Sequence, residues 1–357
     1  LYPKAGVSYR IPGLPRVFDE LKLRAAYGET GNVTLYGRAA DYNLVVGPHS
    51  NIRPERQREL EVGVDAMLFK DAAVVELTGY HQSLSDMLFH RAAAPSTGFS
   101  VAFFNGGEIV NRGVEAMVKV APFQHGTGFS WTSRTLFTLN RSLVTHLPVP
   151  AFPISDTTGL AFFRIEEGAS TTQIVGKDCC DPVTGLSVKR KIGDTEPDFR
   201  ISFLNDFKLG PFELATNAEW QQGSQVINVT RFYYDNYANS PDHLTGGRQR
   251  IDDFDKGLAR VYVEDATFLK VRELKISYDI PSSLFQRYFM AASQARLSVS
   301  SRNLWTFTRY SGLDPEVSNY GNQPVARNFD IAPFPPSRSF WISLELGFDR
   351  FQAGAGG

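Results

Sequence analysis

The chain has 357 residues, a formal net charge of −1 and an aromatic content of 13%. This balance of charge provides no basic field for a phosphate backbone, which argues against a nucleic-acid partner. No apolar run in this sequence reaches the roughly 18 residues of a membrane-spanning helix, so such a helix is excluded, whereas a β-barrel is not.

The first residues, "LYPKAGVSYR", contain no initiator Met and neither the basic nor the apolar region of a signal peptide. We therefore expect the chain to be part of a longer protein. Next, residues 19–30 alternate apolar and polar side chains, as a half-buried strand does. Leu21, Leu23 and Tyr27 share one face, while Lys22 and Arg24 share the other.

Continued along the chain, this alternation predicts about eleven strands, with boundaries uncertain by a few residues. They lie at residues 3–11, 19–30, 57–69, 72–84, 110–121, 128–140, 198–209, 211–222, 265–280, 294–307 and 337–348. One strand is irregular, because its apolar phase shifts between Val271 and Leu274. That shift predicts a bulge or a segment at the rim of the apolar zone.

The connections between these strands alternate in length. Short ones occupy residues 70–71, 123–128, 210–211 and 281–294, and long ones occupy 31–56, 85–109, 141–197, 223–264 and 308–336. Loops above about 15 residues are uncommon in compact soluble domains. Outer-membrane barrels combine short periplasmic turns with long extracellular loops. We therefore predict an all-β fold, an antiparallel portion of a transmembrane β-barrel.

The strand pattern alone is equally compatible with a large soluble β-sandwich or solenoid. Two features favour the barrel: one face of most strands is charged or small, and aromatic rings collect near strand ends, as in the girdles of membrane barrels. These rings belong to Tyr27, Phe69, Tyr80, Phe123, Phe129, Trp220, Tyr278, Trp305, Phe307 and Phe348. We also expect Trp305, Phe307 and Tyr310 at the outer interface, with their ring bodies in lipid.

No catalytic constellation is evident, and we predict no enzyme. Glu59 and Glu61 could pass for a hydrolase dyad, but the neighbouring Arg56 and Arg58 suggest charge balance in a polar wall. The charged residues expected to face the lumen are Arg24, Glu59, Glu61, Asp65, Glu115, Lys119 and Glu345.

The only cysteines, Cys179 and Cys180, are adjacent. Neighbouring residues reach disulfide geometry only with strain, and no further thiol or histidine lies nearby at zinc-ligand spacing. We favour a loop feature, such as a vicinal disulfide, over a metal or redox centre.

Seven motifs recur in one order along the chain, and together they resemble the C-terminal half of the SusC/RagA-type TonB-dependent outer-membrane transporters. They are "LKLRAAYGETGN" (21–32), "RPERQRELEVGVDAMLF" (53–69), "NGGEIVNRGVEAMV" (105–118), "IGDTEPDFRISF" (192–203), "FLKVRELKISYDIP" (268–281), "SRNLWTFTRYSGLDPEVS" (301–318) and "FWISLELGF" (340–348).

The resemblance implies a barrel of about 22 strands around an N-terminal plug domain. Residues 1–348 would form the C-terminal part of the barrel and 349–357 a short periplasmic tail, with the plug absent from this chain. The barrel would lie in the outer-membrane lipid of a Gram-negative bacterium. TonB–ExbB–ExbD would energise import of oligosaccharides or peptides through the missing N-terminal part, under a SusD-like lipoprotein on the extracellular face.

In many relatives an Asp/Asn-rich stretch that resembles a cation-binding loop precedes the segment that matches "IGDTEPDF". Here that place is basic, with Lys177, Lys189, Arg190 and Lys191 beside Asp178 and Asp181, so we predict no metal and no cofactor. Three alternative functions stay open: a siderophore-type receptor, a passive porin and a secreted carbohydrate-binding β protein.

Ligand contacts are expected from long loops that are rich in rings and amides. The first candidate is residues 228–240, with Phe232, Tyr233, Tyr234, Asn236 and Tyr237, and the second is residues 319–328, with Asn319, Tyr320 and Asn322. The alternative is that these rings pack loop against loop or against the lipoprotein.

Overall fold

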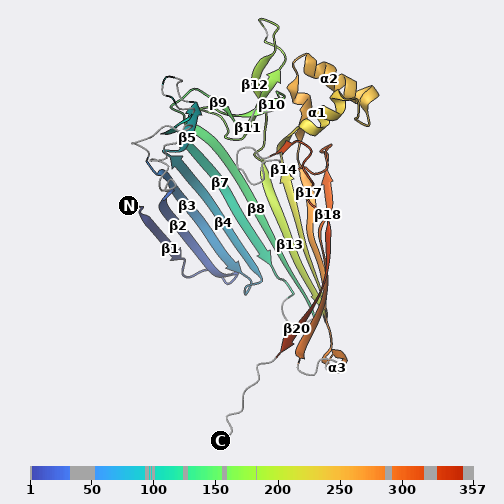
Figure 1. The fold of residues 1–357 in the computed structure, drawn as a ribbon. Coiled ribbons are helices and arrows are strands. Elements are labelled where there is room, and N and C mark those ends of the chain that lie inside the picture. Colours follow the sequence, from blue (N-terminus) through green and yellow to red (C-terminus); the bar gives the residue numbers. More distant parts are fainter. Residues whose placement is uncertain are drawn as a thin grey trace.

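The computed structural model describes residues 2–32, 53–92, 96, 98, 101–123, 128–154, 159–181, 183–285, 292–316 and 328–348. Its main body is an 11-stranded antiparallel sheet, here called the wall, in which successive strands pair as neighbours (Figure 1). The strands are β1 (Lys4–Arg10), β2 (Phe18–Asn32), β3 (Glu55–Leu68), β4 (Ala73–Ser85), β7 (Glu108–Val120), β8 (Phe129–His146), β13 (Phe199–Leu209), β14 (Phe212–Gln222), β17 (Phe268–Asp279), β18 (Ala292–Thr308) and β20 (Ser339–Phe348). All eleven predicted strands are confirmed, and β1 and β20 are the two edges of an open sheet.

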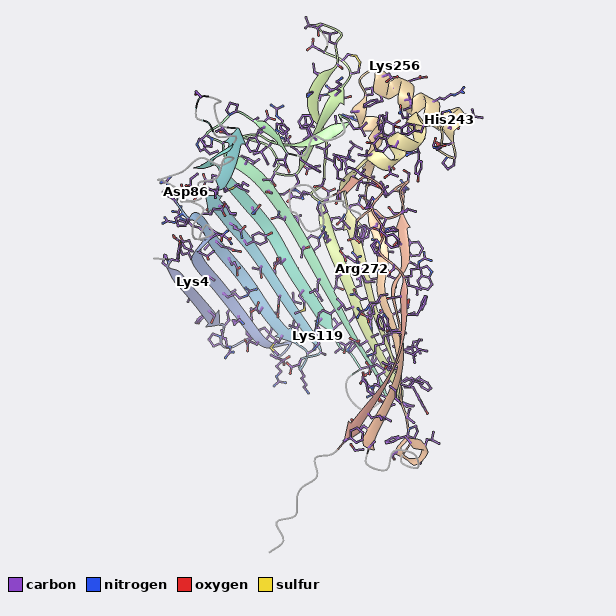
Figure 2. All side chains as sticks on the ribbon, viewed as in Figure 1. Lys4, Asp86, Lys119, His243, Lys256 and Arg272 are labelled. Carbon is purple, nitrogen blue, oxygen red and sulfur yellow. A yellow bond between two sulfur atoms is a disulfide. The ribbon has the colours of Figure 1, made fainter. Side chains whose placement is uncertain are left out.

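One face of the wall carries aliphatic side chains that no second layer of the described residues covers (Figure 2). Val62, Leu77, Ile276 and Val299 are 57, 47, 52 and 49% exposed. A soluble sandwich would seal such rows between two sheets. The sandwich alternative is therefore wrong, and this apolar face is the one that a lipid bilayer covers.

Aromatic rings cluster at the end of the wall where the short turns lie. Phe123 lies 5.7 Å from Phe129 and 6.4 Å from Trp131, and Trp131 lies 6.0 Å from Phe207, between ring centroids. Toward the opposite end of the wall, Trp305 and Phe307 are exposed, as predicted.

Two of the predicted interface rings lie elsewhere. Tyr80 is on the polar face, because it lies three residues after Leu77 in β4 and therefore points to the opposite face. Its hydroxyl donates a hydrogen bond to Asn140 on that face. Tyr310 is 5% exposed and donates to the carboxylate of Asp330. Its ring packs with Val226 and Ala266 instead of entering lipid.

The predicted irregularity of β17 is a bulge. Val271 pairs with Ala218, and Glu273 pairs with Asn217, which leaves Arg272 as the extra residue in the ladder. Because of this extra residue, Leu274 and Ile276 point to the same lipid face as Leu269 and Val271.

The long connections at one end of the wall fold into a separate body, the cap, comprising the described residues of 152–194, 225–265 and 328–331 (Figure 1). One small sheet contains β9 (Phe152–Ile154), β10 (Ala161–Ile165), β11 (Gln173–Asp178) and β12 (Val188–Asp194). A second contains β15 (Gln225–Asn228), β16 (Val263–Asp265) and β19 (Phe329–Asp330). The helices are α1 (Val229–Asn236), the π-helix η2 (His243–Gly247), α2 (Arg248–Asp255) and the 3-10 helix η3 (Ala259–Tyr262).

Among the described residues, the cap has a larger buried apolar core than the wall. Phe163, Ile174, Ile227, Tyr262 and Phe329 are fully buried within one cluster. Outside the wall and cap, β5 (Leu88–Ala92) pairs with β6 (Val101–Asn105), and the short helix α3 (Ser282–Phe285) lies in the connection between β17 and β18. Among the described residues, no helix is long and apolar enough to cross a bilayer.

Candidate functional site

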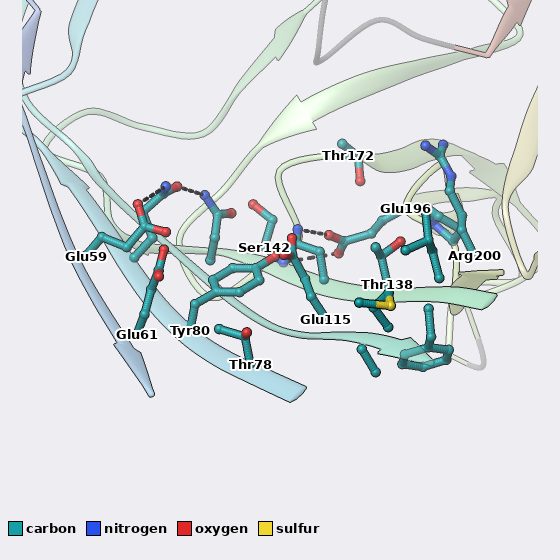
Figure 3. Close-up of a pocket in the computed structure, with 18 of the residues that line it drawn as sticks. Glu59, Glu61, Thr78, Tyr80, Glu115, Thr138, Ser142, Thr172, Glu196 and Arg200 are labelled. Atoms are coloured by element: carbon teal, nitrogen blue, oxygen red, sulfur yellow. Dashed lines mark hydrogen bonds between the residues drawn. The ribbon is translucent and has the colours of Figure 1, made fainter. Parts of the chain in front are cut away.

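The polar face of the wall forms one side of a cavity of about 940 Å³ (Figure 3). Strands β3, β4, β7 and β8 supply most of its lining, and Thr171 and Thr172 of the cap contribute to its rim. The cavity therefore lies where the polar wall meets the long connections.

A hydrogen-bonded chain crosses three elements of this cavity. The Tyr80 hydroxyl donates to Asn140 Oδ1 at 2.8 Å, and Asn140 Nδ2 donates to Glu196 Oε1 at 2.6 Å. Gly113 makes the first contact possible, because a Cβ there would lie 2.3 Å from the Tyr80 hydroxyl. Burial raises the pKa of Glu196, against the hydrogen bonds from Asn140 and the Ser142 backbone N–H.

A second chain links neighbouring strands on the same face. Asn111 Nδ2 donates to Gln82 Oε1 at 2.8 Å, and Gln82 Nε2 donates to Glu59 Oε2 at 3.2 Å (Figure 3). Gln57 Nε2 donates to the same oxygen at 3.2 Å, so two amides hold the Glu59 carboxylate in place at the wall of the cavity.

The lining is rich in carboxylates. Its charged members are Arg24, Glu59, Glu61, Glu76, Glu115, Glu196 and Arg200, which is five acids against two bases. Carboxylates accept hydrogen bonds and repel anions. The cavity suits hydroxyl, amide or cationic groups, whether they belong to a cargo or to another part of the protein.

The lumen-facing prediction is confirmed for Arg24, Glu59, Glu61 and Glu115, which all line the cavity. Asp65 lies in ion pairs with Lys22 and Arg24, at 2.7 and 3.0 Å. The proposed charge balance by Arg56 and Arg58 is wrong. Side chains alternate between the two faces of a strand, so Arg56 and Arg58 point to the same face as Leu60 and Val62, which is the lipid face. On that face Arg58 lies 3.5 Å from Glu29.

The first predicted ligand segment forms α1 instead of an irregular loop. Asn228 caps it, because its side chain accepts a hydrogen bond from the Arg231 N–H at 2.8 Å. Phe232 is partly buried, with its ring centroid 5.1 Å from Phe254 and 5.3 Å from Tyr262. Phe232 therefore contributes to the cap core.

The other residues of that segment, Tyr233, Tyr234, Asn236 and Tyr237, are exposed. Tyr233 and Tyr237 stack with ring centroids 6.4 Å apart. Their ligand role stays a prediction. Asn319, Tyr320 and Asn322 lie outside the described residues.

An ion-pair network joins the wall to the segment that follows β18. Lys270 Nζ lies 2.6 Å from Asp314, and the guanidinium of Arg272 binds both oxygens of Glu316, at 2.6 and 2.7 Å. Arg272 also donates to Glu219 at 2.8 Å. The bulge thus places a second cation beside Lys270, and both hold the returning chain against the polar face.

A second network holds the helices of the cap together. Arg250 donates to Asp235 at 2.6 and 2.7 Å and to both oxygens of Asp242 at 2.8 Å. The hydrogen bonds from Arg250 lower the pKa of Asp242 to about 2. Burial acts to raise the pKa of Asp235, but the hydrogen bonds that it accepts from Arg250 and Tyr262 hold the pKa below the ordinary value.

Cys179 and Cys180 form a disulfide in the connection between β11 and β12. The buried Asp178 beside them pairs with Arg190 at 2.8 Å and Arg260 at 3.0 Å, which ties the β11–β12 hairpin to η3. Within the described ranges, no cluster of His, Cys, Asp and Glu has the geometry of a metal site.

Sequence reasoning missed Tyr80, Asn140 and Glu196 as cavity residues. Tyr80 has the same strand parity as Glu76 and Thr78, which is the signal that could have placed it on the polar face. Glu196 lies in a long connection, where no periodicity predicts its position.

The family model described as TonB dependent receptor-like, beta-barrel matches residues 1–304. TonB-dependent receptor P3 of Formosa agariphila is 25% identical to the chain, and the match covers 92% of the chain and 39% of the relative. TonB-dependent receptor P26 of the same organism is 22% identical, and the match covers 93% of the chain and 40% of the relative. The solved structures of the RagAB peptide importer in its open-open state and of the RagAB peptide transporter have TM-scores of 0.75 and 0.76, at 18 and 19% identity. They match 97% of this chain and 42 and 43% of theirs, so the chain spans about two fifths of its relatives. It belongs to the TonB-dependent receptor-like β-barrel family and lies in the outer membrane of a Gram-negative bacterium.

Proposed function

We propose that the chain supplies the C-terminal part, residues 1–348, of the barrel of an outer-membrane importer that is energised through TonB. The cargo class is oligosaccharides or peptides. The observation that carries the proposal is a wall with an exposed apolar face and an acid-rich polar face, with a cavity of about 940 Å³ beside a folded cap.

The relatives support this proposal. The matched curated proteins are named TonB-dependent receptors. A peptide importer, RagAB, shares the fold over nearly the whole chain. In the proposed protein, the missing N-terminal part supplies the plug and the contact with TonB–ExbB–ExbD, while residues 349–357 end in the periplasm.

The cavity and the cap suggest which groups of the cargo are recognised. The five glutamates of the lining favour hydroxyl, amide and cationic groups over anionic ones. Tyr233, Tyr234 and Tyr237 offer exposed ring faces for a sugar or peptide, or for a SusD-like lipoprotein that covers the extracellular side.

Uptake by the source bacterium tests the proposal. Cells that lack the intact protein are compared with complemented cells for uptake of labelled peptides and oligosaccharides, with and without a protonophore. Energised import predicts that complementation restores uptake and that the protonophore abolishes it. Uptake that survives the protonophore would instead indicate passive diffusion, and rescue only of iron-complex uptake would indicate a siderophore receptor.

A matched pair of variants tests the cap residues. The double substitution Tyr233→Ala/Tyr237→Ala removes two stacked rings and should weaken cargo binding about five- to thirtyfold, at roughly 0.5–1 kcal/mol per ring. Tyr9→Ala removes an equally exposed ring from the edge strand β1 and should leave binding unchanged. Equal binding by both variants would remove these tyrosines from the site while leaving the import proposal intact.

A further inference from the structure

The lipid face of the wall carries a row of cationic and titratable side chains directly above its aliphatic surface. The strand register places Leu60, His81, Arg112 and Arg141 side by side across β3, β4, β7 and β8. The next row toward the short-turn end contains Val62, Gly79, Val114 and Leu139. The row that contains the two arginines therefore lies directly beside an apolar row.

Arg112 and Arg141 face each other on neighbouring strands, so their Cβ atoms lie about 5 Å apart. Like charges in this position destabilise a sheet unless an anion lies between or above them. Among the described residues, the guanidinium of Arg112 hydrogen bonds only to His81 Nδ1, at 3.2 Å. Arg141 donates to Asp198 at 3.1 Å and to the carbonyl oxygens of Asn140 and Pro197, both at 2.8 Å.

A groove of about 540 Å³ begins at these cations and continues over the apolar row. Leu60, Val62, Val114 and Leu139 line its sides, and His81, Arg112 and Arg141 line its charged end. Gly79 gives the groove its depth, because a Cβ there would meet only the Gly113 carbonyl oxygen, at 4.0 Å, within the described residues.

A second groove, of about 480 Å³, lies on the other side of the same two arginines. Its lining includes three cations, Arg112, Arg141 and Lys191, and three carboxylates, Asp194, Glu196 and Asp198. Asp198 pairs with Arg141 and Asp194 pairs with Lys191, so Arg112 is the cation of this groove that has no carboxylate partner among the described residues. An anion between Arg112 and Arg141 would thus have an apolar channel on one side and a polar channel on the other.

We propose that this row is a binding site for a phosphate-bearing lipid of the outer leaflet, with its phosphate on Arg112 and Arg141 and an acyl chain in the groove over Gly79. Two guanidinium groups match the geometry of a phosphate. The aliphatic floor matches a hydrocarbon chain. A free phosphate would use only the charged end, whereas a lipid uses both parts of the groove.

The proposal does not depend on the cargo, because it concerns the outer surface of the wall. The test uses the intact protein, purified in a zwitterionic detergent and incubated with phosphatidylglycerol, with phosphatidylcholine of the same acyl chains, or with inorganic phosphate. Native mass spectrometry then counts the bound lipids, and tryptophan emission checks that each variant is folded.

Wild-type protein should retain phosphatidylglycerol in preference to phosphatidylcholine, and millimolar phosphate should not displace it. Arg112→Gln should reduce retention about fivefold and Arg112→Gln/Arg141→Gln about thirtyfold, since each cation near a membrane surface contributes about 1 kcal/mol. Gly79→Val keeps both arginines but fills the groove, and it should also reduce retention. Arg134→Gln makes the same charge change on the polar face of β8 and should have no effect.

Three results would overturn the proposal. They are equal retention of the two lipids by the wild type, unchanged retention in the folded Arg112→Gln/Arg141→Gln variant, and displacement of the lipid by inorganic phosphate. The last result would identify a site for a free anion. Loss of retention in Arg134→Gln would show that the lipid responds to overall charge instead of to this row.

Discussion

In the wall, Leu77 and Ile276 point away from the protein and stay about half exposed, whereas Phe163, Ile174 and Phe329 of the cap have 0% exposure. Both regions come from the same chain and use the same apolar residue types. The difference is the solvent that each region meets: lipid covers the apolar face of the wall, and water surrounds the cap. The cap therefore folds like a small soluble domain on the end of a membrane sheet.

Removal of an aromatic ring from the cap core should produce the largest difference in stability between the cap and the wall. Phe163→Ala leaves a cavity in the cap core and should lower the free energy of cap opening by about 3–5 kcal/mol. Hydrogen exchange of residues 159–194 and 225–265 measures this change, while the amides of β2, β3 and β4 should stay protected. Equal exchange in both regions would show that cap and wall unfold as one unit.

Breaking the ion pairs of the cap should have the next largest effect. Arg250→Ala leaves the buried Asp235 without its cation and should destabilise the cap by about 3 kcal/mol. Native-state proteolysis within residues 229–262 measures the loss. As a control, Lys256→Ala removes an exposed cation whose Asp253 partner is 3.5 Å away, and it should change the rate of cleavage little.

Two exposed leucines sharpen the comparison further. Leu77→Arg places a charge in the middle of the lipid face and should lower the stability of the folded barrel in lipid by about 2 kcal/mol. Leu186→Arg makes the same change in the β11–β12 connection of the cap, where water meets the side chain, and should cost less than about 0.5 kcal/mol. Urea titration of both variants in vesicles measures the difference. Equal costs would contradict the assignment of the apolar face to lipid.

The wall was predictable from the sequence because strand alternation reports on a single property, the face of each residue. The two-residue alternation of apolar and polar side chains placed Glu59, Glu61 and Glu115 on the polar face. The interruption of this alternation after Val271 predicted the bulge that the strand register confirms. The interpretation that Arg56 and Arg58 balance the charge of Glu59 and Glu61 was wrong. It relied on proximity in sequence and ignored that the arginines, at even positions, point to the opposite face of the strand from the two glutamates.

The cap was not predictable in the same way. Its core joins residues as distant as Phe163, Tyr262 and Phe329, which no local pattern connects. Tyr310 illustrates the result: it follows two rings that do face outward, but the strand ends at Thr308, and the ring of Tyr310 packs with Val226 and Ala266 at the base of the cap. Long-range packing determined its position.

Low pH should destabilise the cap but not the wall, and this is the smallest and most reversible of the expected effects. The pKa of Asp242 is about 2, because Arg250 stabilises its charged form, and the pKa of Asp235 is also lowered. Groups with a lowered pKa stabilise the fold above their ordinary value, near 3.8, and that contribution is lost as the pH falls toward 2. We expect pepsin to cleave residues 229–262 progressively faster from pH 4 to pH 2.

The wall supplies an internal reference for the acid experiment, because all four tryptophans of the chain lie in its strands. Their emission should stay constant while cleavage of the cap increases. Asp242→Asn removes one of the two titrating partners of Arg250, so the variant should be cleaved faster at pH 4 and should respond less to further acid. A wild-type rate of cleavage that stays flat from pH 4 to pH 2, relative to a denatured substrate, would show that the Arg250 network does not control opening of the cap.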